Sequence, residues 1–148
     1  MDASDACDYL MDKAKLRGQT RYGWPPNFRA SELACKCCGE LEDRASARHL
    51  AWVLQSLRHL CNAPITINSG YRCSKHNKEI GGARNSAHLR CVAADIVCSK
   101  VPPDMMANMI EELIRDGRIP NGGLGRYNTF THYDMRTTNP ARWDERGK

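Results

Sequence analysis

Three residues of the sequence, His88, Asp95 and His132, have side chains that could together bind a metal ion. Two neutral imidazoles and one carboxylate suit Zn²⁺, because a catalytic zinc takes three protein ligands and keeps a fourth position open. His88 and Asp95 are separated by seven positions within HLRCVAAD. The alternative is an ordinary buried strand whose histidine and aspartate are satisfied by hydrogen bonds, and the spacing alone leaves both interpretations open.

The backbone that could position these ligands must be irregular in one place. Side chains alternate along a strand, so an odd spacing would send His88 and Asp95 to opposite faces. A loop or β-bulge near Arg90 and Cys91 is therefore required if both side chains are to point the same way. The later segment FTHYD is simpler, because alternate residues share one face of a predicted strand: Phe130, His132 and Asp134.

The composition predicts one globular domain. The chain has 148 residues, 41% of them hydrophobic and 26% charged, and no run approaches the ~20 apolar residues of a membrane span. The net charge of +5 comes from 22 Lys and Arg against 17 Asp and Glu, spread along the chain. A solvated surface accounts for this charge. Nucleic-acid binding is not expected, because no basic stripe is interleaved with aromatic residues.

Hydrophobic periodicity predicts an α+β fold: a compact single domain in which a small antiparallel sheet carries the candidate site and helices flank it. Helices are predicted over residues 46–61 and 102–117. In the first of these, the apolar stripe consists of Leu50, Val53, Leu54, Leu57 and Leu60, with His49 and His59 on the solvated flank. Strands are predicted over residues 63–72, 88–98 and 126–136, with a polar loop at 73–86 and a glycine-rich turn at 122–125.

The chain is divided into an N-terminal extension, residues 1–27, and a domain, residues 28–148. A short helix is predicted at Ala6–Leu16, and Ser31 is predicted to cap a helical turn. The N-terminus lacks the basic start and apolar centre of a secretory signal, so synthesis into the cytoplasm is expected.

Eight cysteines are many for this length, and without a secretory signal we expect reduced thiols. The CKCC segment, with Cys35, Cys37 and Cys38, resembles half of a zinc knuckle but lacks a second CxxC or HxxxH group downstream. A structural zinc and simple burial as small hydrophobic residues are the two interpretations.

Two longer stretches, SGYRCSKHNKEIGGARNSAHLRCVAADI and GLGRYNTFTHYDMR, narrow these possibilities. Together they resemble the zinc D-Ala-D-Ala carboxypeptidases and the related phage endolysin peptidases of the M15 type. The resemblance extends upstream through SELACKCCG, LQSLR and PITINSGYR and covers about residues 28–136. Several spaced motifs in the same order make it specific.

The resemblance implies that His88, Asp95 and His132 are ligands of a Zn²⁺ cofactor. Arg72 of SGYR would bind the substrate's carboxylate or polarise the scissile carbonyl, a task suited to a guanidinium fork. Ser86 would line the same cleft. The implied activity is hydrolysis of a peptide bond in peptidoglycan stem peptides, by a D-Ala-D-Ala carboxypeptidase or an endolysin-type endopeptidase acting at the bacterial cell wall, with a monomer expected.

Two positions depart from the family pattern. Cys91 replaces the glycine that usually follows HLR, and it is either a packing residue or an additional ligand. Thr129 occupies a position three residues before the last ligand, where many relatives carry an acidic general base. Asp134 is the nearest carboxylate in sequence and serves either as the base or as a group that orients a ligand histidine, in which case Arg136 would pair with it. His76 is a weaker candidate for the base.

The missing carboxylate keeps a second hypothesis open. The chain would then be a non-catalytic, zinc-stabilised binding or structural module, as in the hedgehog signalling domain, which resembles this family in fold and zinc site.

Overall fold

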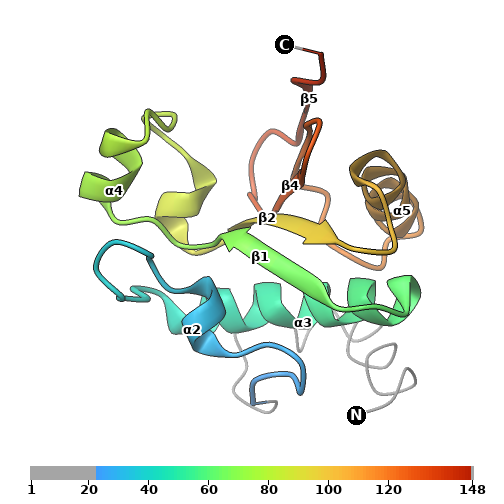
Figure 1. Ribbon diagram of the computed structural model, residues 1–148, viewed down its shortest axis with the longest axis horizontal. Helices are drawn as coiled ribbons and strands as arrows, with labels where there is room; N and C mark the ends of the chain where they lie inside the picture. The colour runs from blue at the N-terminus through green and yellow to red at the C-terminus, as the bar shows by residue number, and fades with distance from the viewer. Residues whose placement is uncertain (1–22, 148) are drawn as a thin grey trace.

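The computed structural model describes residues 23–147, and a five-stranded sheet lies at its centre (Figure 1). The strand order is β1-β2-β4-β3-β5, with antiparallel pairing throughout except between β3 and β5, which run parallel. The strands are β1 (Ile65–Ser69), β2 (Ala93–Cys98), β3 (Gly123–Arg126), β4 (Thr131–Asp134) and β5 (Ala141–Asp144). The helices are α2 (Ala30–Leu33), α3 (Arg44–Cys61), α4 (Ser74–Glu79) and α5 (Pro103–Arg115), with a 3₁₀ turn, η1 (Ala87–Arg90). This single-domain α+β fold is the class predicted from the sequence.

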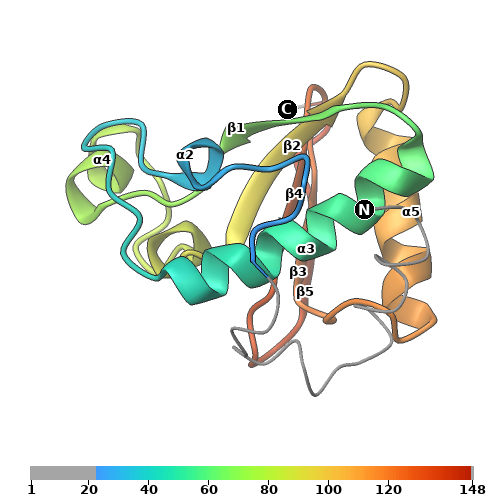
Figure 2. The same ribbon diagram turned by 90° about the horizontal axis from the view of Figure 1, so that it is seen from below.

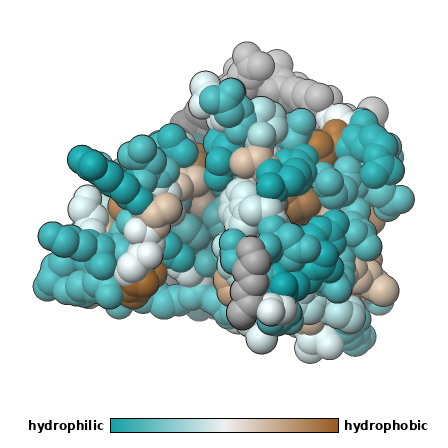
Figure 3. All heavy atoms as spheres, turned by 90° about the horizontal axis from the view of Figure 1, so that it is seen from above, coloured by the Kyte–Doolittle hydropathy of each residue, from teal (hydrophilic) through white to brown (hydrophobic). Residues whose placement is uncertain are grey.

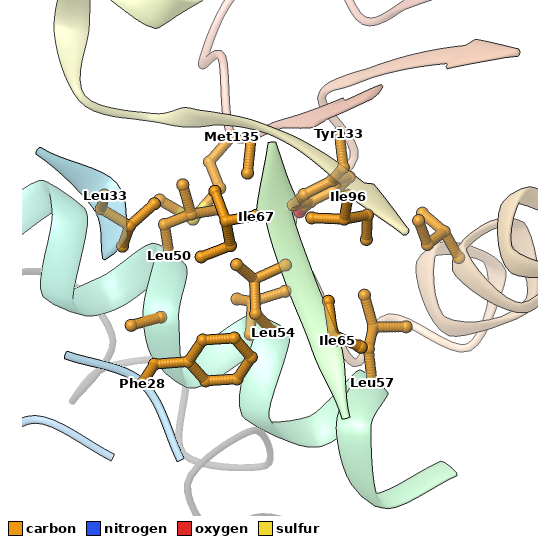
Figure 4. Packing of buried hydrophobic residues seen from close by; sticks show 14 of the residues in the cluster. Phe28, Leu33, Leu50, Leu54, Leu57, Ile65, Ile67, Ile96, Tyr133 and Met135 are labelled. Atoms are coloured by element: carbon orange, nitrogen blue, oxygen red, sulfur yellow. The ribbon is translucent and has the colours of Figure 1, made fainter. Parts of the chain in front are cut away.

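Helix α3 covers one face of the sheet, as the views from the side and from below both show (Figures 1 and 2). The side chain of Asp43 begins the helix by accepting a hydrogen bond from Ser46 N at 3.1 Å, and Asn62 ends it in a left-handed conformation. The apolar stripe of α3 packs against alternate residues of β1, β2 and β4 (Figure 4). The residues at the centre of this core are Leu50, Leu54, Leu57, Ile65, Ile67, Ile96 and Tyr133.

The opposite face of the sheet carries polar residues because side chains alternate along each strand. In the β2–β4 pairing Asp95 is directly opposite His132, while the core-facing Ala94 is opposite Tyr133. In the β3–β4 pairing Gly125 is opposite His132 and Gly123 is opposite Asp134. The candidate site is therefore built on the sheet face that α3 does not cover.

Other segments surround the sheet. Helix α5 contacts β3 and β4, and it begins with Pro103 in its first turn, where the missing N–H costs no hydrogen bond. Residues 23–28 lie against α3, where Asn27 and Gln55 exchange hydrogen bonds of 3.1 and 2.8 Å. The predicted helix Ala6–Leu16 lies outside the described residues, and the domain division at residue 28 stays a prediction.

Three local predictions were wrong at their element boundaries. Arg29, not Ser31, precedes the first turn of α2, and its backbone N–H donates to the Glu32 carboxylate at 2.6 Å. The polar segment predicted as a loop at 73–86 contains α4, whose first turn is capped by the Cys73 thiol. The second predicted strand starts only at Ala93, because residues 87–90 form η1.

The C-terminal half also differs from the prediction. The glycine-rich stretch predicted as a turn forms β3 instead. Glycine fits this strand because a Cβ atom at Gly123 or Gly125 would collide with the side chain of Asp134 or Trp143. The segment from Ala141 to Asp144, for which no element was predicted, adds β5 to the sheet edge. On α3, Leu60 is 53% exposed and lies outside the core, whereas His49 and His59 are half-buried instead of solvated.

The surface seen from above, opposite α3, is mostly hydrophilic with small apolar areas (Figure 3). Within residues 23–147, no helix has the length and apolar character needed to cross a bilayer.

The packing of the core predicts a large loss of stability when a buried side chain of α3 is shortened, and a small one when an exposed side chain is shortened. Leu54 is fully buried at the centre of the core, so Leu54→Ala is expected to lower the free energy of unfolding by roughly 2–5 kcal/mol. Leu60→Ala on the same helix is the matched control and should change it by less than about 0.5 kcal/mol. Urea denaturation at fixed zinc concentration measures both values, and equal effects would contradict this description of the core.

Candidate metal centre and cleft

Three buried ligand atoms converge on the polar face of the sheet. His88, Asp95 and His132 are 3%, 8% and 6% exposed, and one potential ligand atom from each lies within 4.8 Å of the other two. Asp95 Oδ1 is 3.3 Å from His88 Nε2 and 2.9 Å from His132 Nδ1. The two imidazole rings meet edge to face, with centroids 5.1 Å apart. The structure thus brings together all three residues that the sequence suggested as metal ligands.

Two backbone features produce this convergence. Cross-strand pairing puts Asp95 directly beside His132, since opposite residues of an antiparallel pair share a face. His88 reaches the same place because the chain between it and Asp95 is interrupted by η1 and by Cys91, which has φ +61° and ψ +26°. The predicted irregularity near Arg90 and Cys91 is confirmed, and the left-handed conformation is one that glycine adopts more readily than cysteine.

Hydrogen bonds on the far side of each ring fix which nitrogen faces the centre. His88 Nδ1 is 2.7 Å from the Gly70 carbonyl oxygen, which only accepts, so this nitrogen carries the proton. His132 Nε2 is 2.8 Å from Asp134 Oδ2, whose carboxylate likewise accepts. The unprotonated nitrogens, His88 Nε2 and His132 Nδ1, are left to face Asp95 Oδ1. Two imidazole lone pairs and a carboxylate oxygen are a donor set that fits Zn²⁺.

Asp134 is a fully buried carboxylate that pairs with the partly exposed Arg136. Its side chain is 0% exposed and accepts from Arg136 Nε at 2.9 Å, Arg136 Nη2 at 2.8 Å and Gly123 N at 2.9 Å, in addition to His132. A Cβ at position 123 would collide with the Asp134 carboxylate, so glycine is required there. With both oxygens occupied, the geometry fits the orienting role for Asp134 and not that of a general base.

The charged groups of the centre shift one another's pKa values. Burial alone would raise the pKa of Asp134, but hydrogen bonds from Arg136 and His132 hold it far below its usual range. Burial alone would also raise the pKa of Asp95, but the neighbouring imidazoles of His132 and His88 outweigh it and hold this pKa far below its usual range. The pKa of His132 is raised, because Asp134 and Asp95 outweigh the effect of its burial.

Arg72 lies beside the metal-site carboxylate. Its Nη2 is 3.3 Å from Asp95 Oδ2, and its Nε donates to Ser69 Oγ at 3.0 Å. Its Nη1 donates to Asn77 Oδ1 at 3.3 Å, and Asn77 in turn donates to the Ala83 carbonyl at 2.9 Å. The guanidinium is thereby fixed, and it leaves Asp95 Oδ1 facing the two imidazoles.

The three ligand residues open onto a cleft of about 570 Å³. One wall consists of the chain from Gly81 to His88, including Ser86, whose Oγ accepts from His88 N at 3.2 Å. The other wall is aromatic: Tyr127 stacks on Phe130 with centroids 4.2 Å apart, and Trp143 lies 5.0 Å from the His132 ring. Arg72, Ser86 and the three ligands all line this cleft, as predicted from the sequence.

The other residues that the sequence analysis considered for the site lie outside the cleft. Thr129 is exposed in the β3–β4 turn and does not line the cleft. His76 is next to Cys37 and Glu79, also outside the cleft. The Cys91 thiol is buried and accepts from Asp43 N at 3.3 Å, so it packs against the start of α3, as the first of its two predicted roles requires.

Sequence reasoning missed three contributors to the site. Asn77 lies within the stretch SGYRCSKHNKEIGG, which the sequence analysis quoted, and its amide oxygen can accept a hydrogen bond from a guanidinium, so the sequence did carry a signal for this residue. Tyr127 and Trp143 gave no comparable signal, because their roles depend on the parallel β3–β5 pairing and on the Trp143 Nε1 to Tyr127 Oη hydrogen bond of 2.9 Å. Gly125 makes room for this indole, since a Cβ there would collide with it.

Comparison with known proteins gives two matches. The family model described as Peptidase M15 matches residues 26–134. A zinc D-Ala-D-Ala carboxypeptidase from Streptomyces albus G is 44% identical over 54 residues, which make up 36% of this chain. The matched segment spans 21% of that relative's length, so the similarity concerns only part of the larger protein.

The Asp134 ion pair predicts an acid-sensitive fold in the metal-free protein. A carboxylate with a lowered folded-state pKa stabilises the fold above its unfolded pKa of about 3.9, and this stabilisation is lost as the pH falls further. Asp134→Asn is expected to cost about 3 kcal/mol at pH 7, since breaking a buried ion pair leaves the partner uncompensated, and to flatten the decline below pH 4.

Glu79→Gln, at an exposed carboxylate, is the control and should follow the wild-type profile. Urea denaturation between pH 2 and 7 in the presence of a chelator measures each free energy of unfolding. A pH profile for Asp134→Asn that runs parallel to the wild type would contradict the assignment.

Proposed function

Because the chain belongs to the peptidase M15 family, we propose that it is a zinc-dependent peptidase that hydrolyses a peptide bond in the stem peptides of bacterial peptidoglycan. The observation that carries this proposal is the convergence of two imidazole lone pairs and one carboxylate oxygen at the floor of an open cleft. The name of the Streptomyces relative supports the substrate class.

In this proposal His88 Nε2, Asp95 Oδ1 and His132 Nδ1 hold the zinc. When bound by three protein ligands, Zn²⁺ supplies a Lewis acid that lowers the pKa of water toward ~7 and polarises a carbonyl. The protein contributes the geometry: the Gly70 carbonyl and the Asp134 carboxylate keep each imidazole in the required tautomer. Asp134 is thus proposed as a positioning residue.

Arg72 is proposed to bind the substrate. A guanidinium has five N–H donors, and the contacts to Ser69, Asn77 and Asp95 use three, which leaves two for a peptide carbonyl or a terminal carboxylate. Its fixed position beside Asp95 would also stabilise the negative charge that develops on the carbonyl oxygen during hydrolysis. Ser86, which accepts from His88 N, keeps its hydroxyl proton available to donate to the substrate backbone.

One observation favours a second candidate function. Among the described residues that line the cleft, Asp95 is the single carboxylate, and the position of the family's usual base is the exposed Thr129. A zinc-stabilised module that binds a stem peptide without cutting it would need no proton acceptor. Zinc binding without turnover is the result that would support this alternative.

Activity should depend on the metal and on its proposed ligands. We expect zinc-loaded protein to release amino acids or muropeptides from purified peptidoglycan, and a chelator or His88→Ala to reduce this rate by at least about 10³-fold. His59→Ala, at a half-buried histidine on α3, is the control and should retain activity.

Mass spectrometry of the products separates the finer possibilities. Release of D-Ala from the stem terminus indicates a carboxypeptidase, whereas cleavage inside the stem indicates an endopeptidase of the endolysin kind. Unchanged peptidoglycan and unchanged synthetic D-Ala-D-Ala peptides, with zinc bound, would contradict the proposed hydrolysis.

Arg72 should act through its shape as well as its charge. Arg72→Lys keeps the charge but loses the planar fork, so kcat/KM is expected to fall about 10- to 100-fold, equivalent to roughly 1.5–3 kcal/mol. The zinc content should remain that of the wild type. Arg84→Lys, at an exposed position next to the cleft wall, is the matched control, and an equal loss in both variants would contradict the role of Arg72.

A further inference from the structure

A second group of ligand atoms lies outside the cleft. The thiols of Cys35, Cys38 and Cys73 are all within 4.8 Å of one another. In the sequence, CKCC lacked a downstream partner, but the fold brings Cys73 to it from 35 residues farther along the chain than Cys38. The missing half of the predicted knuckle is therefore supplied by the residue directly after Arg72.

The backbone around the first two cysteines has the form of a closed turn. Gly39 N donates to the Cys35 carbonyl at 2.8 Å, and Cys35 N donates to the Glu40 carbonyl at 2.8 Å. Gly39 has φ +76°, a left-handed conformation that glycine adopts without strain. This turn places the side chains of the C-x₂-C pair, Cys35 and Cys38, on the same side.

Backbone N–H groups point at two of the sulfur atoms. Cys73 N is 3.4 Å from Cys35 Sγ, and His76 N is 3.4 Å from Cys73 Sγ. These donors stabilise thiolates, the form in which cysteine binds metals.

We propose that Cys35, Cys38 and Cys73 bind a structural Zn²⁺, distinct from the metal of the cleft. Tetrahedral zinc with Zn–S bonds of about 2.3 Å requires sulfur atoms roughly 3.8 Å apart, so the observed group needs only a small contraction. Cys37 and His76 would supply the fourth ligand between them: their ligand atoms lie within 4.8 Å of each other, two residues after Cys35 and three residues after Cys73 in the sequence. Three thiolates favour zinc over the hard cations Mg²⁺ and Ca²⁺.

The position of this site gives it a structural role. It joins the 35–40 turn to the start of α4, and Cys73 is covalently next to Arg72. The 35–40 turn follows α2, where the Leu33 carbonyl accepts from Tyr71 N at 2.8 Å. A metal at the cysteines would therefore hold both chain segments that support Arg72.

Cobalt substitution separates the two metal sites. Bound to thiolates, Co²⁺ gives an intense sulfur-to-metal charge-transfer band in the near ultraviolet, and the cleft site has no sulfur ligand. Reduced, metal-free protein titrated with Co²⁺ should show this band in the wild type, in His88→Ala and in Cys98→Ser, the cysteine control. Cys38→Ser should lose most of it, and zinc content should fall from about two ions per chain to about one.

Cys37→Ser and His76→Ala identify the fourth ligand, because the variant that removes it should weaken zinc binding while the other does not. A second measurement uses the wild-type protein and needs no variants. In wild-type protein, Zn²⁺ should protect Cys35, Cys38 and Cys73 from alkylation by iodoacetamide, as peptide mass spectrometry can detect, while Mg²⁺ should not. Absence of the charge-transfer band together with absence of protection would overturn the proposal, as would a disulfide within the cluster that persists under mild reduction.

Discussion

The carboxylate of Asp95 is the constraint on which the rest of the site depends. It is 8% exposed, and its Oδ1 faces the unprotonated nitrogens of His88 and His132 while its Oδ2 faces Arg72. A buried carboxylate is costly unless cations or hydrogen-bond donors compensate it. With both imidazole protons directed outward, a cation between the three ligand atoms satisfies all of them at once, which makes this pocket suited to a metal and poorly suited to anything apolar.

The two faces of the sheet show how the fold makes room for this constraint. On the face packed against α3, β3 and β4 contribute Leu124 and Tyr133, which are 1% and 0% exposed. On the other face β3 contributes glycines, because Asp134 and Trp143 occupy the space that side chains at Gly123 and Gly125 would need. Alternation along one short strand thus serves core packing on one side and the site on the other.

The difference between these faces also explains what could be predicted from sequence. The apolar periodicity of α3 and α5, the α+β class and the grouping of His88, Asp95 and His132 followed from local patterns and spaced motifs. The strand β5, the Tyr127–Trp143 wall and the contribution of Cys73 to the CKCC group did not, since each arises where segments distant in sequence meet. Glycines at 122–125 predicted a turn because local propensity cannot register a neighbouring indole or carboxylate.

The segment between β1 and β2 both fixes the position of His88 and forms one wall of the cleft. Its base is held by hydrogen bonds from Arg72 N to the His88 carbonyl at 3.1 Å and from His88 Nδ1 to the Gly70 carbonyl at 2.7 Å. Its tip, from Gly81 to Asn85, is mostly exposed and forms one wall of the cleft. Loops tolerate sequence change at exposed tips far better than at hydrogen-bonded bases. Substitutions at the tip can therefore alter the shape of the cleft, while the ligand geometry at the base is preserved.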